Sequence, residues 1–161
     1  MNPALILVTR VILALSLLGS VLVQVVILPL VWADLAGEAF GGRILLVAIA
    51  ALSILCLQVG AIGVWRLLGL VRHGSVFSAA AVRWVDVIIG AIVVLSALVL
   101  VLAIALAPGE VAPGVVGLLC GASLVIAGVA LVVVVMRALL AQAIAREQEA
   151  RELRSELDEV I

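Results

Sequence analysis

Arg66–Arg83, RLLGLVRHGSVFSAAAVR, is a polar interruption near the middle of an otherwise apolar chain. It contains three of the nine arginines, and Trp65 and Trp84 stand on either side of it. The runs before and after it are long enough to cross a membrane as helices. This central stretch therefore decides on which side of the membrane the neighbouring segments begin and end.

The composition excludes an ordinary soluble domain. Hydrophobic residues make up 68% of the 161 residues and charged residues 12%, and the mean hydropathy is +1.53. Soluble domains are about half apolar and about a quarter charged. The formal net charge of −1 gives no basis for nucleic-acid binding. The predicted fold class is all-α, an integral membrane four-helix bundle.

Four apolar runs predict membrane-spanning helices over about residues 4–31, 44–71, 82–107 and 113–137. The first run is too long for a signal-peptide core, so we expect it to be retained, with a bend or stop at Pro29. The links between spans are Asp34–Arg43, where Gly41 and Gly42 are expected to break the helix, and Pro108–Pro113. The predicted organisation is a transmembrane domain, residues 1–145, followed by a helical tail, residues 146–161.

The placement of the arginines predicts the orientation. One side of the membrane would hold eight of them and the other only Arg43; the eight are Arg10, Arg66, Arg72, Arg83, Arg137, Arg146, Arg151 and Arg154. Because basic residues favour the cytoplasmic side, both termini and the central stretch are predicted to be cytoplasmic.

Small and polar residues must bring the spans together, since lipid tails are as apolar as leucine. Each span carries such a stripe at helical spacing: Ser16, Ser20 and Gln24; Ser53, Cys56, Gly60 and Gly63; Asp86, Gly90 and Ala97; and Gly114, Gly117, Gly121 and Gly128. We expect the four stripes to face one another, with Gly60, Gly63, Gly117 and Gly121 as packing positions. The alternative is that Gly117 and Gly121, a GxxxG motif, form a homodimer surface.

Asp86 is the one carboxylate inside a predicted span, and an intramembrane acid is by default a candidate functional group. It follows Trp84 closely, so it lies near the cytoplasmic edge. Arg83, on the same helical face, and Arg66 are its expected ion-pair partners. The alternative is a proton or substrate relay through Asp86.

Gln24 and Gln58 are the deepest polar side chains. We expect them to hydrogen-bond across helices, to each other or to backbone carbonyls, rather than to line an ion pathway. His73 is the one histidine, and it is expected to face solvent or headgroups. Cys56 and Cys120 lie deep in apolar runs, where thiols behave as small hydrophobes. We therefore expect no enzymatic activity, no cofactor and no metal site.

The tail from Arg137 to Ile161 carries a short heptad pattern. Its apolar positions are Ala143, Ala150, Leu153, Leu157 and Val160, and its helix-stabilising charge pairs are Glu147 with Arg151 and Arg154 with Asp158. From Arg146 onward, three positive and six negative charges make it acidic. It is expected to be a solvated helix or an interaction helix that docks onto a partner or a second copy. The basic central stretch is another possible docking site for it.

The chain resembles the bacterial membrane proteins grouped as domain of unknown function 2975. Three segments carry the resemblance: Leu67–Arg83 with Val76-Phe77-Ser78, the link with Ala112-Pro113-Gly114, and the tail with MRALLAQA at 136–143 and SELDEVI at 155–161. The resemblance implies four spans, a bacterial plasma (inner) membrane location, and a gene that often neighbours one for a small helix-turn-helix regulator.

Three functions remain open. The first is a non-enzymatic regulatory or interaction component that partners a cytoplasmic helix-turn-helix regulator. The second is a structural accessory subunit of a larger membrane complex. The third is a small transporter, which would need a titratable acid in mid-membrane, whereas Asp86 lies near the edge.

Overall fold

A computed structural model describes residues 3–37, 40–72, 79–109 and 111–160. Four helical segments are each long and apolar enough to cross a membrane: Ile6–Gly37, Phe40–Leu70, Ala81–Leu106 and Pro113–Arg154. No strand occurs within the described ranges. The protein is therefore an all-α, multi-pass membrane protein, in agreement with the predicted fold class.

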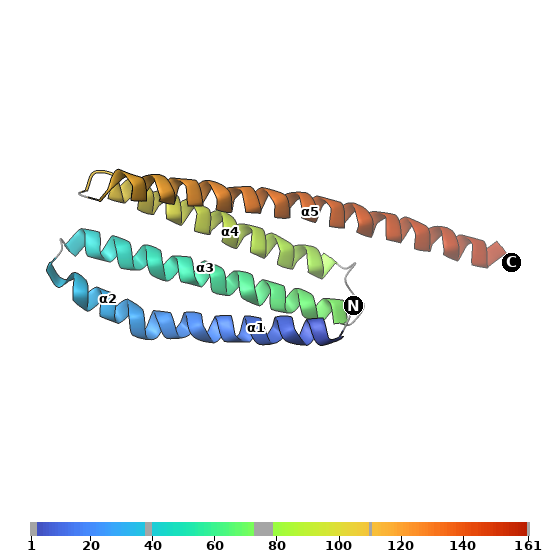
Figure 1. Cartoon of the computed structure of the whole chain (residues 1–161). Helices are drawn as coiled ribbons and strands as arrows, with labels where there is room; N and C mark the ends of the chain where they lie inside the picture. The colour runs from blue at the N-terminus through green and yellow to red at the C-terminus, as the bar shows by residue number, and fades with distance from the viewer. Residues whose placement is uncertain (1–2, 38–39, 73–78, 110, 161) are drawn as a thin grey trace.

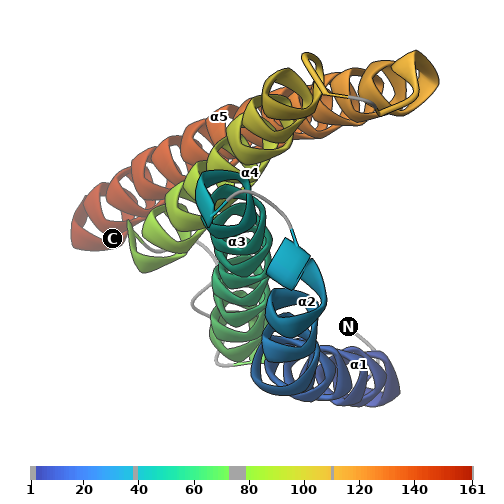
Figure 2. The same cartoon turned by 90° about the vertical axis from the view of Figure 1, so that its left-hand side faces the viewer.

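The helices run antiparallel and pack in chain order along an arc (Figure 2). The third helix packs against the first two and against the fourth, and the fourth packs against the fifth. Both termini lie at the same end of the molecule (Figure 1). The accessible surface is 10845 Å², whereas a compact soluble protein of this mass exposes about 7,600 Å². The row of helices leaves large apolar faces, which a bilayer can cover.

The first span is a bent helix in four pieces. These are α1 (Pro3–Leu22), the π-helical η1 (Val23–Ile27), α2 (Leu28–Asp34) and the 3-10 turn η2 (Leu35–Gly37). Pro29 has no N–H, and its ring crowds the carbonyl one turn earlier. The chain adapts just before it, where the N–H of Leu28 donates to the carbonyl of Val23 at π-helical spacing. Pro29 thus bends the span without ending it.

The predicted breaks between spans are partly wrong. Gly41 and Gly42 lie in the first turn of α3 (Phe40–Arg72) and do not break the helix. A helix satisfies the backbone hydrogen bonds in lipid, and this gain outweighs the helix-propensity cost of about 1 kcal/mol per glycine. The ends of the spans beside the central stretch lie close to the predicted ones, because α3 reaches Arg72 and α4 (Ala79–Leu106) begins at Ala79. The prediction for His73 falls outside the described residues.

The helix α5 (Pro113–Val160) is 48 residues long, which corresponds to about 72 Å. Pro113 is its first residue, a position where the missing N–H has no cost. Only about 20 residues are needed to cross the hydrocarbon core, so α5 continues well beyond the other helices (Figure 1). The tail runs straight on from the fourth span, as the absence of helix breakers after Gly128 led us to expect. The side chains of Arg151, Leu157, Asp158 and Val160 fall outside the described ones.

The four predicted stripes do not face one another. Gly63 is buried against α4, but a Cβ at Gly60, Gly117 or Gly121 would meet no heavy atom within 4 Å. The expectation that these three glycines pack against the other spans of the same chain is wrong, because the helices form a row. The buried contacts between α4 and α5 instead use other small residues: Ser96, Ala103, Ser123 and Ala130.

Gly63 should be sensitive to substitution. A Cβ there would lie 2.7 Å from Cγ1 of Ile88, so Gly63→Leu must push α3 and α4 apart. We expect a loss of about 1–3 kcal/mol in the free energy of unfolding, measured in mixed micelles. Gly60→Leu, one turn away in open space, is the matched control. Equal losses in the two variants would contradict the close approach at Gly63.

Candidate functional site

Polar side chains of α1, η1 and α3 form a cluster inside the apolar spans. Gln58 Nε2 donates to Gln24 Oε1 at 2.9 Å and to Ser20 Oγ at 3.1 Å. Gln24 Nε2 donates to the carbonyl of Ala51 at 3.2 Å, and Ser20 Oγ donates to the carbonyl of Leu17 at 2.8 Å. The two glutamines thus bond to each other, as the sequence led us to expect, and they join the first span to the second.

The π-helical turn places Gln24 in this cluster, and such turns recur at functional sites. A cavity of about 280 Å³ borders the cluster and is lined by Ser16, Leu17, Ser20, Leu57, Gln58 and Ala61. The polar groups here are neutral amides and hydroxyls. They can accept or donate hydrogen bonds to a ligand, but they cannot take up and release protons near neutral pH.

Asp86 forms a two-bond ion pair with Arg137, which joins α4 to α5. Arg137 Nε lies 2.6 Å from Oδ1 and Nη2 lies 3.0 Å from Oδ2. The predicted partners, Arg83 and Arg66, are therefore wrong. Arg137 was missed because only the packing of α5 beside α4 brings it level with Asp86. A carboxylate held by both oxygens favours the structural ion pair over the relay.

Each tryptophan faces an arginine. The guanidinium of Arg10 lies 5.6 Å from the ring centroid of Trp65, and that of Arg66 lies 5.6 Å from Trp84. At the opposite end of the molecule, Arg43 lies 3.9 Å from the centroid of Trp32, whose ring also meets Phe40 edge-on at 6.3 Å. These cation–π contacts link neighbouring helices at their ends, where amphipathic rings prefer the interface. Arg66 is thus engaged with Trp84 rather than with Asp86.

Ser96 and Ser123 make a reciprocal contact between α4 and α5. Each hydroxyl lies 2.9 Å from the backbone carbonyl of the other serine, and the two oxygens lie 3.2 Å apart. They are only 9% and 5% exposed. Sequence reasoning missed this pair, although Ser96 precedes the end of α4 by as many residues as Ser123 follows the start of α5. That symmetry about the connecting turn was the available signal.

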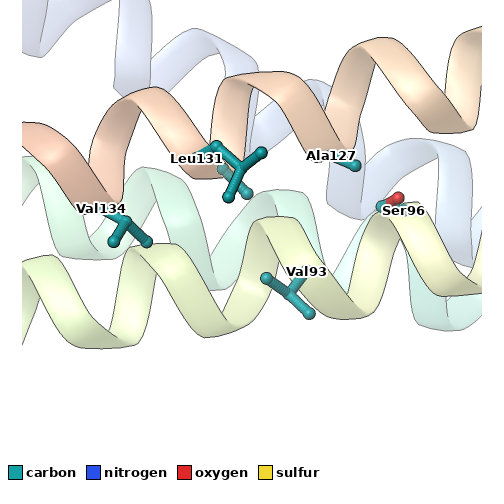
Figure 3. Close-up of a pocket in the computed structure, with 6 residues that line it drawn as sticks. Val93, Ser96, Ala127, Leu131 and Val134 are labelled. Carbon is teal, nitrogen blue, oxygen red and sulfur yellow. The ribbon is translucent and has the colours of Figure 1, made fainter.

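An apolar cavity of about 260 Å³ lies beside this serine pair and is lined by Val93, Ser96, Ala127, Ala130, Leu131 and Val134. Figure 3 shows lining residues from α4 and α5. Because the hydroxyl of Ser96 is engaged with Ser123, the rest of the lining offers only hydrocarbon. The cavity suits an apolar chain and offers no hydrogen bond that would orient a polar substrate.

Within the described ranges, no three His, Cys, Asp or Glu side chains lie close enough to hold a metal ion. Cys56 of α3 and Cys120 of α5 are free thiols. The candidate sites are therefore the neutral amide cluster and the ion pair, both of which act by hydrogen bonding and charge.

A family model described as "Protein of unknown function (DUF2975)" matches residues 6–161. The chain belongs to this family. The DUF2975 match covers all four spans and the tail, so the resemblance noted in the sequence is confirmed. No curated protein and no solved structure matches the chain. Membership of DUF2975 thus assigns no activity.

The serine pair should contribute measurably to stability. Ser96→Ala and Ser123→Ala are each expected to lower the free energy of unfolding by about 0.6–2 kcal/mol. The double variant should lose nearly the sum, because each hydroxyl also reaches a backbone carbonyl that the other substitution leaves in place. Unfolding in mixed micelles measures this, with the exposed Ser16→Ala as control. Single variants as stable as that control would refute the contribution.

Exchanging the charges of Asp86 and Arg137 tests whether their ion pair stabilises the packing of α4 against α5. Asp86→Arg places two cations together and is expected to lower the melting temperature in detergent, whereas adding Arg137→Asp in the same chain should restore it. Arg83→Asp serves as the matched control, because Arg83 is exposed and takes no part in the bonds of Asp86. If the exchanged chain is no more stable than Asp86→Arg alone, the pairing does not hold α4 against α5.

Proposed function

We propose that this protein is a non-enzymatic regulatory or interaction component of the bacterial plasma (inner) membrane. In this proposal the spans anchor the chain, and the tail of α5 presents a cytoplasmic surface to a partner. The observation that carries the proposal is the unbroken course of α5 past the other three spans (Figure 1). A helix needs only about 20 residues to cross a bilayer, so the remaining length requires another explanation.

The chemistry of the tail supports a protein partner. From Arg146 onward it has twice as many acidic as basic residues, and the exposed Leu153 adds an apolar contact. The eight-to-one distribution of arginines supports a cytoplasmic position for both termini. The partner that we propose is a small helix-turn-helix regulator, whose basic surface an acidic helix can engage.

Enzymatic catalysis and proton-coupled transport have less support. The intramembrane polar cluster consists of neutral amides and hydroxyls, and both oxygens of Asp86 are engaged by Arg137. The alternative is a role as an accessory subunit of a larger membrane complex. Copurification with the other subunits at a fixed stoichiometry would support that alternative.

A second copy of the chain is a further proposed partner. Gly117 and Gly121 lie on an open face of α5, away from α4. This favours contact between copies over the intramolecular packing that we expected at these glycines.

The test is capture of partners from membranes solubilised in mild detergent. The intact chain is compared with a chain truncated after Ala145 and with one whose residues 146–161 are scrambled at constant composition. We expect the regulator to copurify with the intact chain only, because register as well as charge should define the docking surface. Equal recovery with all three chains, and no change in the transcripts that the regulator controls, would defeat the proposal.

A further inference from the structure

One face of α5 is uncovered along the helix, inside the apolar segment and beyond it. We call it the α5 seam and define it by Gly121, Gly128, Leu139, Ala143, Ala150 and Leu153. Successive members are separated by seven, eleven, four, seven and three residues, and each step returns to nearly the same side of a helix with 3.6 residues per turn.

The α5 seam points away from the rest of the molecule. Ser123, Ala130 and Arg137, which contact or face α4, lie about 180° around the helix from it. All six seam residues are exposed; Leu139 is 53% exposed and Leu153 61%. A Cβ added at Gly121 or Gly128 would meet nothing within 4 Å.

Lipid can cover Gly121 and Gly128 of the α5 seam, but it cannot cover Ala150 and Leu153. Starting at Pro113, the hydrocarbon core is crossed after about 20 residues, which is before Ala143. Ala150 and Leu153 therefore lie on a charged helix outside the hydrocarbon. An apolar row that continues in heptad spacing into water is typical of a helix that pairs with another helix.

Charge identifies the occupant as a second copy. Glu149 and Arg154 lie on opposite flanks of the α5 seam, in the two positions that meet across a parallel helix pair. Around a two-fold axis, Glu149 of each copy faces Arg154 of the other, which makes two attractive contacts. Two copies inserted in one membrane with the same topology have parallel tails at the same level, so the bilayer itself imposes this register.

We propose that two copies associate through the α5 seam as a parallel, in-register helix pair that runs from the membrane into the tail. This deepens the second-copy association put forward above and rests on it, but not on the helix-turn-helix regulator. Arg146 falls within the seam, between Ala143 and Ala150, and there it opposes its counterpart. A polar residue at such a position weakens the pair while restricting its register.

Disulfide cross-linking in liposomes tests which face of α5 forms the contact between copies. In the full chain carrying Cys56→Ala and Cys120→Ala, Leu153→Cys is compared with Gln148→Cys, which is also exposed but points away from the seam. We expect oxidation to give dimer chiefly at position 153, since only seam positions bring Cα atoms within the reach of a disulfide. Stronger cross-linking at 148 would overturn the seam while leaving the association of copies intact. A monomer in both variants would overturn both, and neither result bears on capture of the regulator.

Charge reversal tests the register by fluorescence energy transfer between labelled copies in liposomes. Glu149→Arg or Arg154→Glu should each weaken association about two- to tenfold, and the double reversal should restore it. Arg146→Leu should strengthen association by removing the opposed cations. Failure of the double reversal to recover association would overturn the parallel, in-register pairing.

A further pair of variants tests the part of the α5 seam that contains Gly121 and Gly128. Gly121→Leu should reduce energy transfer, whereas Gly90→Leu on α4, also in open space, should leave it unchanged. Equal transfer in these two variants would show that the pair does not extend into the membrane.

Discussion

Lipid gives apolar side chains no reason to prefer one another, and this constraint governs the whole structure. Backbone groups must bond within their own segment, so every described span is helical, even across Pro29 and through Gly41 and Gly42. Contacts between helices then depend on small side chains and on a few polar groups. A chain that is 68% hydrophobic has few such groups in its spans, and six of them bond at helix contacts: Gln24, Gln58, Ser96, Ser123, Asp86 and Arg137.

Each junction in the row of helices has its own link, and two of the three junctions are joined by hydrogen bonds. The amides of Gln24 and Gln58 join the first span to α3, the Ser96–Ser123 pair joins α4 to α5, and Asp86–Arg137 joins α4 to α5 near the arginine-rich end. Between α3 and α4 the link is steric at Gly63 and aromatic at Arg66 and Trp84. Because these links act between successive helices, the spans form an arc whose two ends are open (Figure 2).

That open arrangement bears on function. A transport pathway needs polar groups along a common axis. Here the polar side chains bond in pairs between neighbouring helices. What remains available is surface: the uncovered faces of the outer helices and the projecting, acidic end of α5. Surfaces of this kind suit association with other proteins, which is why the proposals concern partners rather than substrates.

Residue type and spacing along the chain were enough to predict the four spans, the start of α5 at Pro113, the mutual bonding of Gln24 and Gln58, and the family. These depend on local hydropathy, on the missing N–H of proline, and on the scarcity of alternative partners in lipid. The sequence could not predict which face of each helix is covered. Small residues occur on opposite sides of α5, and only the position of α4 beside it selects Ser123 and Ala130 over Gly117 and Gly121. The same placement, rather than proximity in sequence, gives Asp86 the guanidinium of Arg137 in place of Arg83 or Arg66, because an ion pair forms with the charge that packing brings level with it.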